Sequence, residues 1–312
     1  MRLRMTLLIF SILFFLLLSL AGDKRTFGMR EMISVENLKQ HVRNIHFDRN
    51  PCDRYHELEQ AAQYIRGEFL KMGMEVEEDF FQWEGRFYKN IVAEKKGMTS
   101  PDKVLILGAH YDTVSGSPGA DDNASAIAVL LEIGRNIQSV PLGSTLKLIT
   151  FSLEEYDYAG STHYVENARK REEKIVGMVS LEMVGFTGLK QNYPHYLNPK
   201  KYPNVGDFIG IIGNNRSKTL MERVHRSFKN HIPQLPSEFL LVPGNGEGME
   251  ETRLSDHCPF WDHGFPALMV TDTAFLRNPN YHLPSDSIDT LDFEFMREVA
   301  IGIFYSILEL TK

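Results

Sequence analysis

The order of short apolar runs and helical segments along this 312-residue chain leaves few folds open. Four apolar runs, each of strand length, lie at 103–109, 145–152, 175–183 and 267–271. Segments that we predict to be helices lie at 123–138, 160–171, 217–230 and 292–310. Because strands that alternate with helices pack as layers, the sequence predicts a layered α/β sandwich.

Weaker patterns complete the predicted fold. An amphipathic helix is expected over 56–72, since Leu58, Ile65 and Phe69 lie on one stripe. Further strands are predicted at 74–81, 88–94, 207–212 and 238–242, and a short helix capped by Ser255 is predicted to end at Gly264. Three loops, at 184–206, 243–255 and 272–291, are longer than most connectors. Long loops in compact domains tend to carry function.

Composition excludes several classes of protein. Hydrophobic residues make up 43% and charged residues 24%, which is ordinary globular usage and excludes disordered, collagen-like and coiled-coil chains. The formal charge is 34 − 41 = −7, so no overall basic field indicates a nucleic-acid partner. Two cysteines, Cys52 and Cys258, are too few for a disulfide scaffold, and one bridge between them is left open.

The first 22 residues indicate export. Arg2 and Arg4 precede an uncharged apolar run, residues 6–22, that ends in small residues. This pattern predicts a cleaved signal peptide or a retained N-terminal membrane anchor. Either leaves the arginines inside, so the remainder is expected to be secreted, periplasmic or anchored to the outer face of the membrane. The remaining ~290 residues, 23–312, fit a single α/β domain.

Polar residues follow the ends of several predicted strands. They are His110, Asp121, the pair Glu154 and Glu155, Glu182 and His282. In an open α/β sheet, the carboxyl ends of the strands border the ligand crevice, so these side chains are expected to meet. Imidazole and carboxylate without thiolate suit zinc, and carboxylates crowded in one crevice need cations between them.

Each of these pieces is weak by itself. Asp121 and the residues after it also fit a helix N-cap, and the Glu154–Glu155 pair also fits a solvated turn. A histidine at a strand end is usually a satisfied or solvated residue. The metal interpretation therefore depends on the pieces occurring together.

Taken together, six segments resemble metallopeptidase family twenty-eight, which includes secreted bacterial two-zinc aminopeptidases. The segments are GAHYDTV (108–114), PGADDNASA (118–126), SLEEYDYAGS (152–161), SLEMVGF (180–186), SDHCPFWDHGFPALMVTDT (255–273) and NPNYHLPSDSIDTLD (278–292). The resemblance runs from about residue 40 to the end. It implies a three-layer α/β/α sandwich with a mixed, mostly parallel central sheet.

The resemblance also implies a set of metal ligands. His110 would bind one zinc ion, Asp121 would bridge two, and Glu155 and His282 would bind the second. Glu182 would complete the first site at a position where many relatives carry Asp, and this is the clearest departure from the family pattern. One extra methylene moves a carboxylate by about 1.5 Å.

Three further residues, Asp112, Glu154 and Tyr281, are expected to assist the reaction. Asp112 would orient His110, and Asp122 would follow Asp121 across a cis peptide bond. Glu154 would take a proton from a water molecule activated between the two zinc ions and pass it to the leaving amine. Tyr281 would donate a hydrogen bond to the oxyanion, although a packed surface tyrosine fits its position equally well.

The leading hypothesis is an exported zinc-dependent exopeptidase, most specifically an aminopeptidase, with a peptide substrate. We expect no nucleic-acid partner, and contact with a membrane only through an uncleaved leader. A glutaminyl-cyclase-like acyltransferase, a carboxypeptidase or dipeptidase, and a non-catalytic binding module are the alternatives. The helical zinc motif HExxH and the serine-hydrolase motif GxSxG are both absent.

Overall fold

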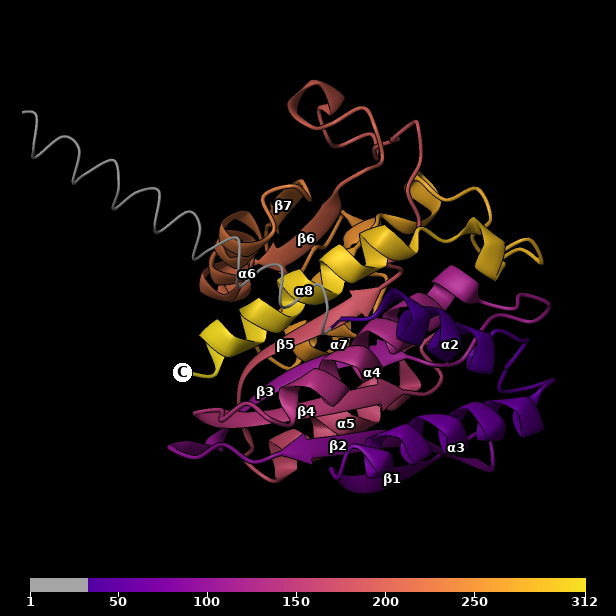
Figure 1. The fold of residues 1–312 in the computed structure, drawn as a ribbon, viewed down its shortest axis with the longest axis vertical. Helices are drawn as coiled ribbons and strands as arrows, with labels where there is room; N and C mark the ends of the chain where they lie inside the picture. Colours follow the sequence, from indigo (N-terminus) through magenta and orange to yellow (C-terminus); the bar gives the residue numbers. More distant parts are fainter. Residues whose placement is uncertain (1–32) are drawn as a thin grey trace, which may run out of the picture.

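The computed structural model describes residues 33–312, so the predicted signal peptide or anchor lies outside the described residues. An eight-stranded sheet with the order β1-β2-β4-β3-β5-β8-β6-β7 forms the centre of the molecule (Figure 1). Its strands are β1 (Glu75–Trp83), β2 (Arg86–Lys95), β3 (Ser100–His110), β4 (Ser144–Phe151), β5 (Lys174–Glu182), β6 (Ile209–Asn214), β7 (Ser237–Val242) and β8 (Ala267–Thr271). The pairs β3/β4, β3/β5, β5/β8 and β6/β7 are parallel, and β1/β2, β2/β4 and β6/β8 are antiparallel. The predicted mixed, mostly parallel sheet is confirmed.

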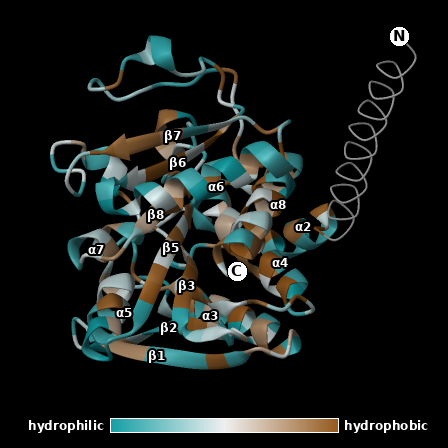
Figure 2. Cartoon of the chain, turned by 90° about the vertical axis from the view of Figure 1, so that its left-hand side faces the viewer, coloured by the Kyte–Doolittle hydropathy of each residue, from teal (hydrophilic) through white to brown (hydrophobic). Residues whose placement is uncertain are grey.

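Helices cover both faces of the sheet, which gives three layers (Figure 2). One face carries α2 (Val35–Ile45), α3 (Tyr55–Lys71), α4 (Ala126–Ile137), α6 (Lys218–His231) and α8 (Phe293–Leu310). The other face carries α5 (Ala159–Lys170) and α7 (His257–Asp262). The predicted three-layer α/β/α sandwich is therefore confirmed.

Side chains of β3 alternate between the two layers of core. Leu105 and Leu107 pack into the large apolar cluster under α4 and α8, whereas Val104 and Ile106 pack into the smaller cluster beside α5 and α7. This period of two is the geometry of a strand that is covered on both faces. Helix α4 packs against α2, α3, α8 and the sheet, and nearly all of its residues are buried. This explains why its sequence is apolar except for Glu132, Arg135 and Asn136.

Helix α2 is the one helix of the described residues, short one-turn helices aside, that the sequence analysis missed. It begins after Ser34, whose hydroxyl accepts a hydrogen bond from the Asn37 N–H. Leu38, Val42 and Ile45 bury one face of the helix. All of the predicted helices and strands occur, with ends that differ from the predicted ends by a few residues. Between residues 33 and 312, no helix is both long and apolar enough to cross a bilayer.

The two cysteines do not form a disulfide bond. Cys52 is exposed and Cys258 is buried, and both are free thiols. Burial raises the pKa of the Cys258 thiol to about 12, so this side chain is a protonated packing residue at neutral pH.

Candidate metal centre

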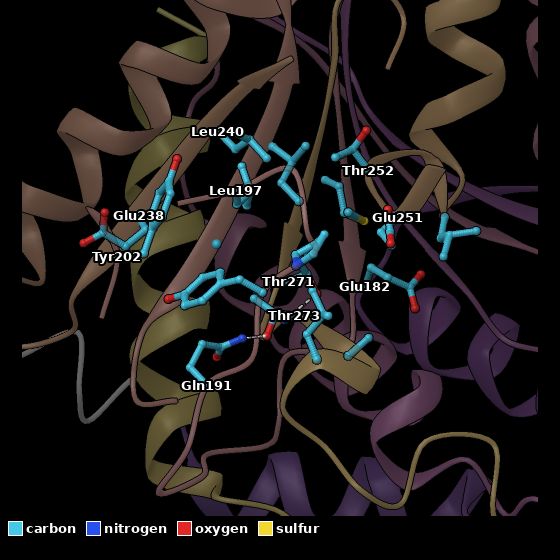
Figure 3. Close-up of a pocket in the computed structure, with 18 of the residues that line it drawn as sticks. Glu182, Gln191, Leu197, Tyr202, Glu238, Leu240, Glu251, Thr252, Thr271 and Thr273 are labelled. Carbon is cyan, nitrogen blue, oxygen red and sulfur yellow. Dashed lines mark hydrogen bonds between the residues drawn. The ribbon is translucent and has the colours of Figure 1, made fainter. Parts of the chain in front are cut away.

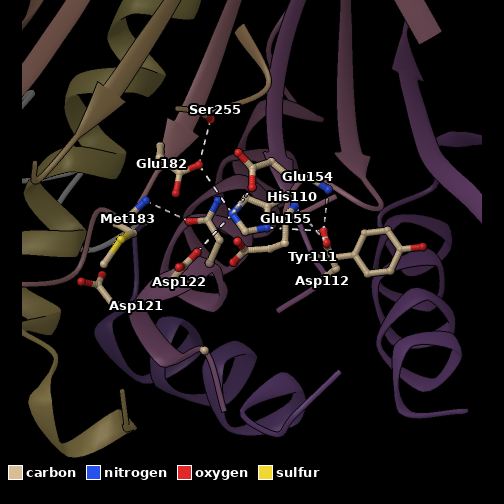
Figure 4. A network of polar contacts seen from close by, with 12 residues as sticks. His110, Tyr111, Asp112, Asp121, Asp122, Glu154, Glu155, Glu182, Met183 and Ser255 are labelled. Carbon is tan, nitrogen blue, oxygen red and sulfur yellow. Dashed lines mark hydrogen bonds and ion pairs between the residues drawn. The ribbon is translucent and has the colours of Figure 1, made fainter. Parts of the chain in front are cut away.

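Several chain segments bring polar side chains to the edge of the sheet where the parallel strands β3, β4, β5 and β8 end (Figure 4). Strand β3 ends at His110 and β5 ends at Glu182. The remaining side chains come from loops: Glu154 and Glu155 after β4, Asp122 in the turn η1 (Ala120–Ser125), and His282 after β8. Parallel strands place their carboxyl ends together, so the fold itself assembles this cluster.

The first group of side chains surrounds His110. Its Nε2 atom lies 3.2 Å from Oδ1 of Asp122 and 3.5 Å from Oε2 of Glu182. All three side chains are buried. Within residues 33–312, neither ring nitrogen of His110 has a hydrogen-bond partner. Buried polar atoms are nearly always paired, so these orphaned nitrogens indicate a place for a ligand.

The second group surrounds His282 and shares Asp122 with the first. Nε2 of His282 lies 3.2 Å from Oδ2 of Asp122 and 3.2 Å from Oε2 of Glu155. Asp122 therefore presents one carboxylate oxygen to each histidine. Nε2 of His282 and Oε1 of Glu155 are also buried without a hydrogen-bond partner among the described residues. Imidazole nitrogens with carboxylate oxygens are zinc donors, and each group could hold a metal ion.

The carboxylates of the cluster favour positive charge between them. Burial acts to lower the pKa of His282, but Asp122 and Glu155 outweigh burial and raise that pKa to about 10. His110 behaves in the same way, since Glu182 and Glu154 raise its pKa well above its ordinary value despite complete burial. A cation bound among these groups would meet the same attraction.

Asp121 is not part of either group, and the prediction that it bridges two metal ions is wrong. Its Oδ1 accepts the Gly185 N–H at 2.9 Å and its Oδ2 accepts Nδ2 of Asn278 at 2.7 Å. Figure 4 shows the Asp121 carboxylate turned away from His110. Asp122 takes the shared position, and the cis peptide bond joins Asp122 to Asn123 rather than Asp121 to Asp122.

The sequence model described as Peptidase family M28 matches residues 90–307. The chain belongs to peptidase family M28.

Two sequence relatives and one solved structure show which proteins this M28 chain resembles. The chain is 33% identical to the uncharacterized protein YfbL of Escherichia coli over 285 residues, which is 86% of each protein. It is 29% identical to aminopeptidase YwaD of Bacillus subtilis over 231 residues, 72% of this chain but 45% of that one. The structure of a zinc aminopeptidase from Bacillus subtilis superimposes with a TM-score of 0.59 and 25% identity, over 74% of this chain and 52% of that one. The chain thus spans about half the length of these two aminopeptidases.

Asp112 lies beneath the two groups of side chains and accepts hydrogen bonds from the backbone of Glu154 and Glu155. Its Oδ1 accepts the Glu154 N–H at 3.1 Å and its Oδ2 accepts the Glu155 N–H at 3.2 Å. The same Oδ1 lies 3.5 Å from Nδ1 of His110. The Asp112 carboxylate therefore holds the turn that carries Glu154 and Glu155, and it faces Nδ1 of His110 on the side of the ring away from Asp122.

Glu154 lies at the edge of the first group. Its Oε2 is 4.0 Å from Nε2 of His110, which is farther than Asp122 or Glu182. Burial raises the pKa of Glu154 well above its ordinary value. Leu153, just before it, has a φ of 57°, a left-handed conformation that costs energy for a residue with a side chain.

Ser255 contacts Glu182 instead of capping helix α7 as predicted. The N-cap of α7 is Asp256. The Ser255 hydroxyl donates to Oε2 of Glu182 at 2.8 Å and lies 2.9 Å from the Ser180 hydroxyl. The side chain of Glu182 thus reaches a buried serine pair.

Tyr281 stands between the cluster and a neighbouring apolar hollow. Its ring stacks on that of His282, with centroids 3.7 Å apart. Tyr281 and Glu182 line both the polar mouth of the cluster and the apolar hollow. Burial raises the pKa of the Tyr281 hydroxyl, which keeps it protonated and able to donate a hydrogen bond.

Two supporting residues were missed by the sequence analysis. Asp286 accepts the N–H of Asp121 at 2.9 Å and that of Asp122 at 3.1 Å, and so fixes the turn that carries the shared carboxylate. Arg49 is fully buried, and its guanidinium group donates to backbone carbonyls. Its partners are the carbonyls of Ile45, Phe47, Tyr111, Pro118 and Gly119. A single arginine in a loop belongs to no periodic sequence pattern. The role of Arg49 could therefore be recognised only from its complete burial in the structure.

Proposed function

We propose that this chain is a zinc-dependent aminopeptidase that removes N-terminal residues from peptides. The observation that carries this proposal is the carboxylate of Asp122, which presents one oxygen to His110 and the other to His282. Membership of family M28 makes the chain a metallopeptidase-type hydrolase. The aminopeptidase names of its relatives support release of N-terminal residues.

The residues divide into two metal-holding sets. His110, Asp122 and Glu182 would hold one zinc ion, and His282, Asp122 and Glu155 would hold a second. Zinc, when bound, supplies Lewis-acid chemistry that polarises a carbonyl group and lowers the pKa of water.

Three residues of the chain would assist the reaction. Glu154 would accept a proton from the attacking water and deliver it to the leaving amine, a role for which its raised pKa is suited. Tyr281 would donate a hydrogen bond to the carbonyl oxygen as negative charge develops there. Asp112 would keep His110 in the ring orientation that directs Nε2 toward Asp122.

A peptide library tests this proposal. The purified protein is stripped of metal with a chelator, restored with zinc, and incubated in both forms with a mixed library read by mass spectrometry. We expect loss of N-terminal residues only in the restored form. Trimming at the C-terminus would reassign the chain as a carboxypeptidase, and loss of ammonia from N-terminal glutamine without cleavage would reassign it as a cyclase.

We also propose that residues 1–22 direct export. The support is the basic start and the uncharged apolar run of residues 6–22. Fractionation of cells that express the full chain, with N-terminal sequencing of the product, tests this proposal. A full-length product in the cytoplasm would contradict it.

A further inference from the structure

An apolar hollow leads away from the proposed metal centre across the sheet (Figure 3). Its floor follows the strand register: Glu182 on β5 pairs with Thr271 on β8, Thr271 with Gly210 on β6, and Gly210 with Glu238 on β7. Directly paired residues share a face of the sheet. Glu182 and Glu238 therefore lie at the two ends of one row, three strand spacings or about 14 Å apart.

Aromatic side chains form the walls of this hollow. Tyr193 and Tyr202, from the long loop after β5, form a tilted ring pair with centroids 5.5 Å apart. Phe208, just before β6, adds a buried ring. The loop is fastened over the hollow by the Tyr196 hydroxyl, which donates to Oε2 of Glu251 at 2.8 Å. Aromatic walls suit a guest with an apolar stem, and their ring faces also attract cations.

The hollow is acidic as well as aromatic. Its described lining residues include Glu182, Glu238 and Glu251 but no lysine, arginine or histidine. Among residues 33–312, the Glu238 carboxylate forms no hydrogen bond or ion pair. Partial burial raises the pKa of Glu238, and the charge of Lys229 only partly opposes this effect without forming an ion pair. A cationic guest would supply the missing partner.

The length of the hollow matches a long side chain. In an aminopeptidase, the scissile carbonyl lies beside the metal-holding residues, here at the Glu182 end. An extended arginine side chain reaches about 7 Å beyond its Cα atom, given bond lengths near 1.5 Å. A charge-assisted hydrogen bond adds about 2.8 Å, and the peptide carbonyl spans the remaining distance from the Glu182 end. The guanidinium group then comes within reach of Glu238.

We propose, on the basis of the aminopeptidase function above, that this hollow selects substrates whose N-terminal residue is arginine or lysine, and that Glu238 is the specificity-determining residue. The aromatic walls hold the methylene stem. Glu238 pairs with the cationic end, and Glu251 adds negative charge nearby while it holds the loop through Tyr196.

Matched pairs of substrates test this proposal. The zinc-restored protein is assayed with aminoacyl-4-nitroanilides of arginine and its neutral isostere citrulline, of lysine and norleucine, and of leucine. We expect kcat/KM for arginine to exceed that for citrulline by roughly tenfold or more, as for hydrogen bonds between charged groups. The variant Glu238→Gln is expected to bring this ratio close to one. The control Glu222→Gln, on the exposed face of α6, is expected to keep the wild-type ratio.

Three outcomes would overturn the inference. Equal kcat/KM for arginine and citrulline in the wild-type protein would remove the selectivity, whether or not the variants fold. An equal loss on all five substrates in Glu238→Gln would show a structural role. If none of the five substrates releases its N-terminal residue, both this inference and the aminopeptidase function are wrong. If the leucine substrate is cleaved but arginine is not preferred, only this inference is wrong.

Discussion

The Ser255 hydroxyl donates a hydrogen bond to Oε2 of Glu182 at 2.8 Å. Both side chains are buried, and Ser180 lies 2.9 Å behind Ser255. The same Oε2 is 3.5 Å from Nε2 of His110. Glu182 is thus held between a serine pair and a histidine.

The variant Ser255→Ala is expected to weaken zinc binding by about tenfold, because the partners that orient a metal ligand typically contribute tenfold to a hundredfold in affinity. Zinc titration against a chromophoric chelator measures this change. The control is Ser306→Ala, since the Ser306 hydroxyl donates to Gly302 within α8. Unchanged affinity in Ser255→Ala would mean that this hydrogen bond does not position Glu182.

The variant Glu154→Gln is expected to lower kcat by roughly 10²–10⁴-fold, the range for loss of a general base. Its zinc content is expected to stay at the wild-type level, because Glu154 is farther from His110 than either Asp122 or Glu182. In contrast, Glu155→Gln is expected to lose zinc, since Glu155 contacts His282. Steady-state kinetics with metal analysis separates the two, and full activity of Glu154→Gln would remove its assignment as the base.

Much of the fold could be predicted because its elements carry strong local signals. Strand β3 is a continuous apolar run covered on both faces, and its end at His110 could be placed from the chain alone. The choice between Asp121 and Asp122 could not be made, because both carboxylates come just before one helix. The turn η1 and its anchor Asp286 decide which of the two faces the histidines, and Asp286 lies far away in sequence.

Asp121 and Asp122 are expected to respond differently to truncation. Asp122→Ala removes the shared carboxylate, so its zinc content after dialysis is expected to fall toward zero. Asp121→Ala leaves the Gly185 N–H and Asn278 Nδ2 without their acceptor, which costs about 1–3 kcal/mol per unsatisfied group. Metal analysis and urea unfolding distinguish the two losses. Loss of zinc from Asp121→Ala at unchanged stability would restore the original assignment of Asp121.

Arg49 is expected to be a stability determinant of the loop that leads to Asp122. Arg49→Lys keeps the charge but cannot reach carbonyls as widely spaced as those of Tyr111 and Gly119. Several buried carbonyls then lose a donor, and we expect a loss of about 2–5 kcal/mol in the free energy of unfolding. Urea unfolding measures this loss, and a change below about 0.5 kcal/mol would contradict it.

His257 is expected to make the metal-free protein less stable in mild acid. Complete burial lowers the pKa of His257 to about 4, while Nε2 lies 2.9 Å from the Thr252 carbonyl as a neutral donor. A histidine whose pKa is lower in the folded state than in the unfolded state stabilises the fold fully at pH values above its ordinary pKa near 6.5. This stabilisation is lost as the pH falls from 6.5 toward 4. Between pH 7.5 and pH 5, the loss from this residue is about 2 kcal/mol.

The variant His257→Gln isolates this contribution, because a glutamine amide can still donate to the Thr252 carbonyl but does not titrate. Urea unfolding at pH 7.5 and pH 5, with a chelator present to exclude metal, gives the free energy of unfolding of both proteins. We expect the variant to lose about 2 kcal/mol less than the wild-type protein over this interval. A drop of the same size in both proteins would mean that His257 is not protonated on unfolding in this range, and that the carboxylate cluster accounts for the acid sensitivity instead.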